Sequence, residues 1–410
     1  MTTVTPTRTA GTAQALPLLF ASCLSVLGAV LLAPIIPQLF GAFPGVPQGL
    51  VPLIISAPAL MIAVFAPFAG QIADRVGRKN LLIGAMIVYA FVGTAPLWLP
   101  AEFSFILVSR LLVGVCEAAI MTCCTTMIGD YFAGDRRNRY FGLQSVFTTI
   151  SATIFLLVGG VLGASGWRTP FLVYALSLII VIPMFFVLWE PKKSPEAMAA
   201  PMAGAKSRIP WRTLALPLVV TLFGGFAFFV VLIEPPQVYA TLGLTDSAAI
   251  GPISAVASIA TAIVAFQFGR LARRGAKVLL PIALAAMAIG YVVVWVAANV
   301  GSLPGVIAGV LIASAGTGLL LPTLVGWSVG KIQFAERGRA TGVWTSAFFL
   351  GQFLTPILML VIQGALGVSV AGAVGVVGIA CAVAAIALAL AVRPGPIVAT
   401  AEPAASVAAV

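Results

Sequence analysis

Long apolar runs separated by short polar segments make up most of the chain. A helix of about 20 apolar residues crosses the hydrocarbon core of a bilayer, so runs of this length predict membrane-spanning helices. We expect spans over residues 15–40, 50–69, 81–99, 104–129, 141–163, 170–189, 213–239, 249–268, 278–298, 305–329, 341–363 and 370–392. The pattern therefore predicts an all-α membrane protein with twelve transmembrane helices.

Composition excludes the soluble alternative. Of the 410 residues, 61% are hydrophobic and 8% are charged, and the mean hydropathy is +1.14. A typical soluble protein has about a quarter of its residues charged. The first apolar run is too long for the core of a signal peptide, so we expect it to be retained as the first span.

The positions of the positive charges predict the orientation. If the N-terminus is internal, Arg110 lies within a span and Arg168 in an external loop, and all the other Lys and Arg residues fall on the cytoplasmic side. Positive residues concentrate in cytoplasmic loops of membrane proteins. The net charge of +11 is therefore explained by the membrane orientation of the chain. We expect no nucleic-acid partner. We expect a prokaryotic inner-membrane protein with both termini in the cytoplasm.

Two internal loops are repeated in the second half of the chain. The segment Gly70–Lys79 resembles Gly269–Lys277, and residues 137–142 resemble residues 337–342, in the same order and at nearly the same offset. Such an echo is typical of two duplicated six-span halves. We expect a cytoplasmic tail at 1–14, a first bundle at 15–189, a cytoplasmic linker at 190–212, a second bundle at 213–392 and a tail at 393–410.

Two ionisable side chains lie inside the fourth apolar run. Arg110 and Glu117 are seven residues apart, which places them on nearly the same helical face, roughly 10 Å apart along the axis. Charged residues at membrane depth are costly, and they usually face a bundle interior or a wet cavity. This pair is therefore the first candidate for a functional site.

The composition argues against enzyme chemistry. The chain has no histidine, and its five cysteines all lie in apolar runs without a spacing that suits a metal or a disulfide framework. Glycine-rich tracts such as 372–378 fit close helix packing and imply no cofactor loop. We expect no catalytic residues, no metal and no cofactor.

Three segments resemble motifs of the major facilitator superfamily. These are the loop from Gly70 to Lys79, Arg110 with Gly114 in the fourth span, and the stretch Gly166–Phe171 before the sixth. The resemblance implies two pseudo-symmetric six-helix bundles around a central cavity, and secondary transport by alternating access. We therefore expect a transporter that meets membrane lipids and functions as a monomer.

The same resemblance assigns gating roles at the internal ends of the spans. In the family, the loop Asp and Arg pair with an acidic residue that ends span four and with the start of span eleven, and this latch stabilises the outward-facing state. The corresponding gating residues here are Asp74, Arg75, Gly77, Arg78 and Asp130. In the second copy of the loop the acidic position is Arg273, so we expect no symmetric latch there.

Glu117 is the candidate proton-coupling residue and also a candidate substrate-binding residue. Burial disfavours the charged form of a carboxyl group, and without histidine only carboxyl groups are suited to carry protons. Its position resembles the fourth span of Spinster-like lysolipid transporters, although residues 15–40 lack the acidic partner that those proteins carry. The alternative is a structural glutamate. Arg110 either binds an anionic group of the substrate or braces backbone carbonyls.

The second half of the chain offers weaker candidates for substrate binding. Glu234 is either a solvated interfacial glutamate or a second proton or cation site, and Trp344 is available for stacking. We expect the cavity lining to draw on Gln144, Thr148, Ser254, Ser258, Thr317, Trp344 and Gln352. An apolar second half suits a substrate with an apolar body and one polar or charged end.

The sequence therefore predicts a proton-coupled transporter of a small amphipathic organic solute. A lysolipid or an organic anion is the alternative cargo, since the fourth span resembles both drug/proton antiporters and Spinster-like proteins. A transporter-like sensor or a lipid scramblase is the alternative from another functional class. The direction of transport is left open.

Overall fold

Helices form at every predicted span in the computed structural model, which describes residues 10–190, 211–329 and 334–392. Within these residues, twelve helices are long and apolar enough to cross a membrane, which confirms the predicted fold class. The first six spans comprise α1 (Thr12–Val30) with η1 (Ala33–Ile35) and α2 (Ile36–Ala42), α3 (Leu53–Val76), α4 (Arg78–Trp98), α5 (Phe103–Tyr131), α6 (Gly134–Gly163), and η3 (Thr169–Ala175) with α7 (Leu176–Val187). The last six comprise α9 (Trp211–Ile233) with α10 (Pro235–Thr241), α11 (Ser247–Leu271), α12 (Ala276–Asn299), α13 (Leu303–Val329), α14 (Phe334–Leu366) and α15 (Val370–Ala391).

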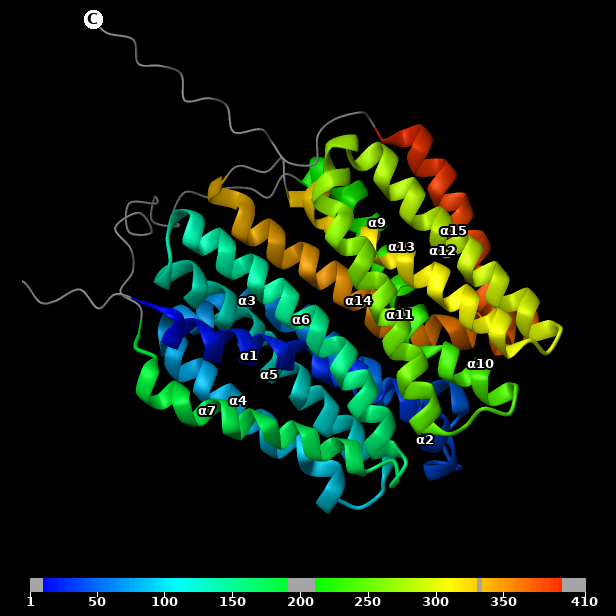
Figure 1. Cartoon of the computed structure of the whole chain (residues 1–410), viewed down its shortest axis with the longest axis horizontal. Helices are drawn as coiled ribbons and strands as arrows, with labels where there is room; N and C mark the ends of the chain where they lie inside the picture. Colours follow the sequence, from blue (N-terminus) through cyan, green and yellow to red (C-terminus); the bar gives the residue numbers. More distant parts are fainter. Residues whose placement is uncertain (1–9, 191–210, 330–333, 393–410) are drawn as a thin grey trace, which may run out of the picture.

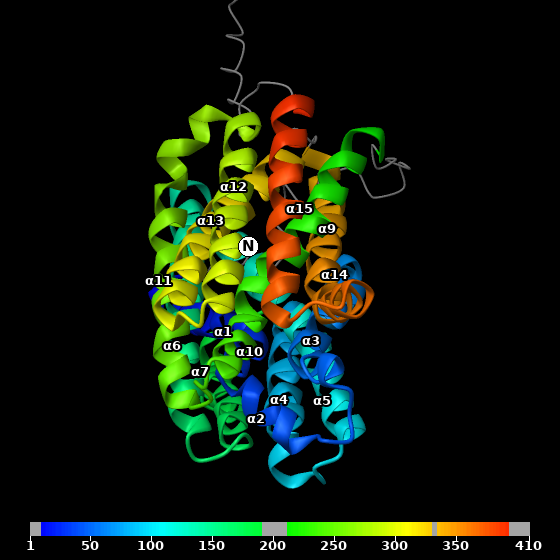
Figure 2. The same ribbon diagram turned by 90° about the vertical axis from the view of Figure 1, so that its right-hand side faces the viewer.

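The helices form two bundles, each with its own apolar core. One core cluster draws on the first six spans and is joined by only two residues of α9, Phe229 and Ile233. The other core cluster draws entirely on the last six spans. The bundles lie side by side, and they meet where α3 packs against α14 and α6 packs against α11. Figure 2 shows the same two pairs from a perpendicular direction.

The helices run between two opposite ends of the molecule (Figure 1). We call the end where α7 stops and α9 starts the linker end, and the opposite end the far end; α1 also begins at the linker end (Figure 1). The predicted tails and linker fall mostly outside the described residues, and their boundaries stay predictions.

Spans one and seven are broken at matching places. Pro34 and Pro37 interrupt span one after α1, and Pro235 and Pro236 interrupt span seven after α9. Proline removes a backbone donor and clashes with the preceding turn, so a continuous helix is disfavoured there. The segments beyond the breaks, α2 and α10, are each seven residues long. The matching breaks support the duplication inferred from the loops.

Several helices extend beyond the predicted apolar runs at the linker end. Helix α3 continues to Val76, and α6 begins at Gly134 rather than near residue 141. The apolar run marks the hydrocarbon core of the bilayer, whereas a helix can continue into water with charged side chains. Large apolar side chains such as Phe186 and Leu390 point outward from the bundles, as expected for a lipid-facing surface.

Candidate functional site

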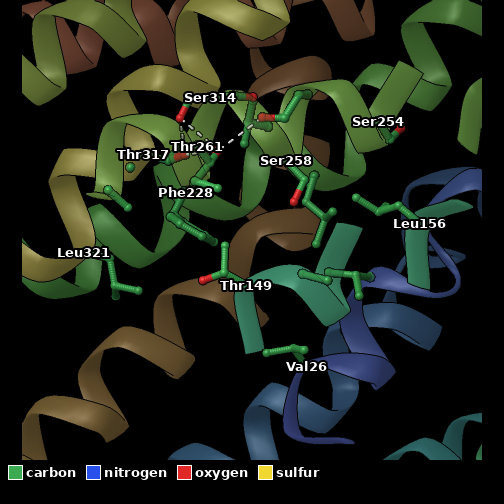
Figure 3. Close-up of a pocket in the computed structure, with 18 of the residues that line it drawn as sticks. Val26, Thr149, Leu156, Phe228, Ser254, Ser258, Thr261, Ser314, Thr317 and Leu321 are labelled. Atoms are coloured by element: carbon green, nitrogen blue, oxygen red, sulfur yellow. Dashed lines mark hydrogen bonds between the residues drawn. The ribbon is translucent and has the colours of Figure 1, made fainter. Parts of the chain in front are cut away.

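A cavity of about 280 Å³ lies between the two bundles. Helices α1 and α6 line one side, and α9, α11 and α13 line the other, with Pro235 of α10 at the edge. Figure 3 shows apolar side chains such as Val26 and Phe228 facing hydroxyl groups across this space. The cavity is therefore a site shared by both halves of the chain, as alternating access requires.

Four of the seven predicted lining residues are in the cavity wall. Thr148, Ser254, Ser258 and Thr317 line the cavity. Gln144 instead bonds Ser22 and Thr125, at 2.9 and 3.2 Å, and so ties α6 to α1 and α5. Three further hydroxyl groups also line the cavity and were not predicted. They belong to Thr149, Thr261 and Ser314. Serine and threonine are common packing residues in membrane helices, so their sequence positions carry little signal.

Trp344 and Gln352 do not line the cavity in this structure. Both side chains are buried in the second bundle. Trp344 stacks on Phe348, with the ring centroids 5.6 Å apart and an interplanar angle of 13°. The indole N–H of Trp344 has no hydrogen-bond partner among the described residues. Trp344 therefore packs within the second bundle, and its predicted role in substrate stacking has no support from its position.

At the far end of the cavity, α6 and α11 approach so closely that only glycine fits. A Cβ atom at Gly160 would lie 2.6 Å from the carbonyl oxygen of Ser247 and 2.7 Å from the Cα atom of Gly251. Gln38 of α2 donates to Ser247 Oγ at 3.1 Å and to the carbonyl oxygen of Gly163 at 2.9 Å. We call these contacts the far-end seal. The seal joins both bundles across one end of the cavity.

Glu117 lies inside the first bundle and is only 2% exposed. Its Oε1 atom accepts from the backbone N–H of Gly28 and from the hydroxyl of Tyr89, each at 3.2 Å. The Tyr89 hydroxyl also lies 3.0 Å from the carbonyl oxygen of Leu24. A Cβ atom at Gly28 would lie 2.6 Å from Glu117 Oε1. Glu117 of α5 is therefore bonded to α1 at a glycine, and a larger residue there would displace the carboxyl group.

Helix α1 separates Glu117 from the cavity. Val26 and Val30 of α1 line the cavity, whereas Gly28 of the same helix contacts Glu117. At about 100° per residue, Gly28 lies roughly 160–200° around the helix from those two valines. The two faces of α1 thus meet the buried carboxyl group and the central cavity respectively.

Arg110 is fully buried and lies between α4, α5 and η3, outside the cavity lining. Its Nη2 atom donates to the carbonyl oxygens of Val92 and Gly93, at 3.2 and 2.9 Å. Its guanidinium carbon lies 4.9 Å from the ring centroid of Phe171 and 4.8 Å from that of Tyr174. These contacts fit the brace on backbone carbonyls, one of the two alternatives expected from the sequence.

Glu234 is 1% exposed, so the interpretation as a solvated interfacial residue is wrong. The proline break turns the carboxyl group inward, towards Tyr291, Val294 and Val374 of the second bundle. Its Oε2 atom accepts from the side-chain amide of Gln237 at 3.1 Å. Glu234 is therefore a second buried carboxyl group, next to the cavity wall at Pro235 but facing away from it.

The predicted latch residues come together at the linker end. Arg78 pairs with Asp74 at 2.9 Å and donates through Nη1 to Asp130. Gly77 adopts a φ of 96°, a left-handed conformation that favours glycine. Arg75 is exposed. The loop after α3 thus contacts the end of α5, as the family resemblance implies.

Glu190 joins this cluster, and the sequence analysis did not single it out. Its carboxylate accepts from the backbone N–H groups of Arg78 and Lys79, at 2.6 and 3.0 Å. These are the first residues of α4, where a negative charge is favoured by the helix dipole. Nearby, the hydroxyl of Tyr131 donates to the carbonyl oxygen of Trp189 at 2.5 Å. The segment after α7 is therefore fastened to α4 and α5.

The start of span eleven lies against span two. Ser346 of α14 donates to the carbonyl oxygen of Ala63 of α3 at 2.6 Å, and Gly342 faces Pro67. The latch contact was predicted with the start of span eleven, and the side chains just before that span, at 330–339, lie outside the described set. In the part of the chain that the structure describes, no three acidic or cysteine side chains gather closely enough to hold a metal ion.

Two bacterial drug-resistance proteins are similar to part of the chain. The quinolone resistance protein NorA of Staphylococcus aureus is 25% identical over 181 residues, or 43% of this chain and 46% of NorA. The class H tetracycline resistance protein of Pasteurella multocida is 26% identical over 191 residues, or 45% of this chain and 46% of that protein. The matches span less than half the length of these relatives.

Solved structures share the fold over nearly the whole chain. A bacterial homologue of the human lysosomal transporter Spinster, inward-facing and unoccupied, aligns with a TM-score of 0.67 at 17% identity, covering 93% of this chain and 95% of the homologue. Its occupied form gives a TM-score of 0.68 at 16% identity, with coverages of 92% and 94%. The sequence profile of the Major Facilitator Superfamily matches residues 18–330 and 219–408. The chain therefore belongs to the Major Facilitator Superfamily and is a twelve-span membrane transporter.

Proposed function

We propose that this protein moves a small amphipathic organic solute across the membrane by alternating access, driven by protons. The cavity between the bundles carries this proposal, because both halves of the chain line it and the far-end seal covers one side. Opening the seal would expose the same cavity at the far end. The names of the drug-resistance relatives favour export as the direction.

Glu117 is the proposed proton site. Its network can accommodate both protonation states, because the single hydroxyl proton of Tyr89 can be given either to Glu117 or to the carbonyl oxygen of Leu24. A charged Glu117 accepts from Tyr89, whereas a neutral Glu117 donates to Tyr89 while Tyr89 donates to Leu24. The buried charged side chains of the described residues are Arg110, Glu117 and Glu234. Of these three, only Glu117 of α5 bonds both to α1, at Gly28, and to α4, at Tyr89.

The membrane orientation is part of the proposal. We propose that the linker end faces the cytoplasm of the bacterial inner membrane, because the Lys and Arg residues gather in the segments on that side. The latch of Asp74, Arg78 and Asp130 would then lie at the cytoplasmic surface. Reporter fusions to the loop after α4 and to the C-terminus check this assignment, with the loop expected outside and the C-terminus inside.

Glu117→Gln in proteoliposomes tests proton coupling. The solute is first selected by its thermal stabilisation of the purified protein, from a panel of neutral, anionic and cationic compounds. The variant should lose accumulation driven by a pH gradient, because glutamine cannot release a proton. It should keep solute counterflow, which needs only alternating access.

Glu102→Gln is the matched control, because Glu102 is an exposed carboxylate beside the same helix, α5. This variant should accumulate solute like the unmodified protein. Gradient-driven accumulation that survives in Glu117→Gln would exclude Glu117 as the coupling residue. Loss of both accumulation and counterflow would instead assign Glu117 a structural role.

A further inference from the structure

No charged side chain lines the cavity, within the part of the chain that the structure describes. Its wall is made by Val, Leu, Ala, Phe, Pro and Gly residues together with the hydroxyl groups of serine and threonine. From the sequence, Arg110 and Glu117 were candidates for contact with the substrate. The structure instead leaves both halves of the wall uncharged.

Both buried carboxyl groups lie behind the wall. Glu117 is on the opposite side of α1 from Val26 and Val30. Glu234 lines a small separate pocket in the second bundle. This pocket and the cavity share three wall residues, Val231, Pro235 and Val310. A solute in the cavity therefore meets apolar side chains where it would need a counter-charge.

The threonine hydroxyl protons of the wall are committed to backbone carbonyls. Thr148 and Thr149 both donate to the carbonyl oxygen of Ser145, at 3.0 and 2.8 Å. Thr317 donates to the carbonyl oxygen of Ser314 at 2.7 Å. A hydroxyl group has one proton and two lone pairs. These side chains thus face the cavity as hydrogen-bond acceptors.

We propose that the cavity selects an uncharged solute with an apolar body and at least one N–H or O–H donor. This inference rests on the proposed transport function and names its substrate class. An ion moved into this cavity loses its hydration without gaining a partner, which is unfavourable. A solute donor can bond to the threonine oxygens, whereas a solute that carries only acceptors leaves those oxygens unpaired.

Four dansyl compounds test the proposal on the purified full-length protein in nanodiscs. Dansylamide is neutral and donates through its sulfonamide N–H, whereas its N,N-dimethyl derivative lacks that donor. Dansylglycine is an anion, and dansyl-ethylenediamine is a cation. In equilibrium fluorescence titrations, dansylamide should bind at least about ten-fold more tightly than each of the other three compounds. A ten-fold loss of affinity is the size expected when one polar group is desolvated and left unpaired.

Ser258→Asp supplies the missing counter-charge and should invert the selectivity. Ser258 lines the cavity and bonds Thr153 of the other bundle at 3.0 Å, so a carboxylate there lies at the centre of the interface. The variant should gain about ten-fold affinity for dansyl-ethylenediamine, while the uncharged control Ser258→Asn should not. Thr149→Asp, on the opposite wall, repeats the test if the first variant is unstable.

The outcomes separate this inference from transport itself. Equal affinities of the unmodified protein for charged and neutral compounds would overturn the inference, as would a failure of dansylamide to bind. Cation binding that Glu234→Gln abolishes would also overturn it, because the carboxylate would then reach the cavity. Dansylamide that binds selectively but is not moved by a pH gradient would contradict the proposed function and leave the selectivity intact.

Discussion

A single tyrosine proton lies between two acceptors in the network around Glu117. The Tyr89 hydroxyl is 3.2 Å from Glu117 Oε1 and 3.0 Å from the carbonyl oxygen of Leu24. The other ionisable groups that interact with this pair are Arg110 and Cys116 of α5 and Tyr174 of η3. Among the residues that the structure describes, Tyr89 is therefore the one side chain outside α5 that bonds directly to the proposed proton site.

Tyr89→Phe should slow proton release from Glu117. The charged carboxylate loses a donor, and a hydrogen bond to a charged group contributes about 1.5–3 kcal/mol. Turnover at neutral pH should fall about ten-fold or more, and should recover as the pH is raised, while solute affinity stays unchanged. Transport measured as a function of pH in proteoliposomes checks this.

Tyr291→Phe is the control for the tyrosine substitution. Tyr291 is equally buried and donates to the carbonyl oxygen of Ala227 in the second bundle. Its loss should lower stability without moving the pH profile. An unshifted profile in Tyr89→Phe would mean that the hydroxyl does not influence protonation of Glu117.

Some of these residues could be recognised from the sequence and others could not. Arg110 and Glu117 stand out because charge is costly inside an apolar run. Tyr89 and Gly28 carry no such signal, since an aromatic residue and a glycine are common in any membrane helix. Their importance comes from the distance between α1, α4 and α5, which the sequence of one chain does not reveal.

Helix α1 connects the proposed proton site to the cavity. One of its faces carries Gly28 against Glu117, and the other carries Val26 and Val30 in the cavity wall. A change of hydrogen bonding at Gly28 can therefore displace the wall that the solute touches. Substrate and proton need not share a pocket to influence one another.

Gly28→Ala should uncouple protonation of Glu117 from solute movement through the cavity. The new Cβ atom would lie 2.6 Å from Glu117 Oε1, so α1 and α5 must separate or the carboxyl group must move. Solute counterflow should persist, whereas accumulation driven by a pH gradient should fall several-fold. Gly84→Ala in α4 is the control, because nothing lies within 4 Å of a Cβ atom there. Equal accumulation by the two variants would contradict this function of α1.

Asp130→Asn should weaken the latch at the linker end. Arg78 and Asp130 are each 21% exposed at the side chain, and partly exposed pairs contribute up to about 1 kcal/mol. We expect turnover to change by about two- to five-fold, with solute affinity unchanged. Asp135→Asn, an exposed residue in the first turn of α6, is the control. A changed ranking of solutes would assign Asp130 to binding.

The helices themselves were predictable, but their rotation about their own axes was not. Apolar runs marked all twelve spans, whereas the breaks at Pro34 and Pro235 were not predicted, although proline is a recognisable helix breaker. A helix that is apolar on all sides gives no signal for the face that points inward. For this reason the sequence did not show that α1 would lie between Glu117 and the cavity, or that Glu234 would turn away from water.

In the far-end seal, the backbones of α6 and α11 come into direct contact at Gly160 and Gly251. Such a contact can open and close as a unit because no side chain interlocks across Gly160 and Gly251. The duplicated loops predicted two halves, whereas the partners across the interface depend on packing that one sequence does not specify.

Gly160→Ala should force the far end apart. A Cβ atom there would lie 2.6 Å from the carbonyl oxygen of Ser247. Labelling of Ser254→Cys by an impermeant maleimide added from the far side should increase several-fold, and the five native cysteines are buried. Gly142→Ala, also in α6 and with open space around it, is the control. Unchanged labelling would show that the seal does not limit access.

The uncharged cavity wall has a cost for the cell. A solute that suits apolar side chains and a few hydroxyl groups also dissolves in the lipid around the protein. Such a solute diffuses back through the bilayer, so every gradient that the transporter builds leaks away continuously. The steady concentration difference is then set by turnover and abundance relative to membrane permeability, and not by the size of the proton gradient alone.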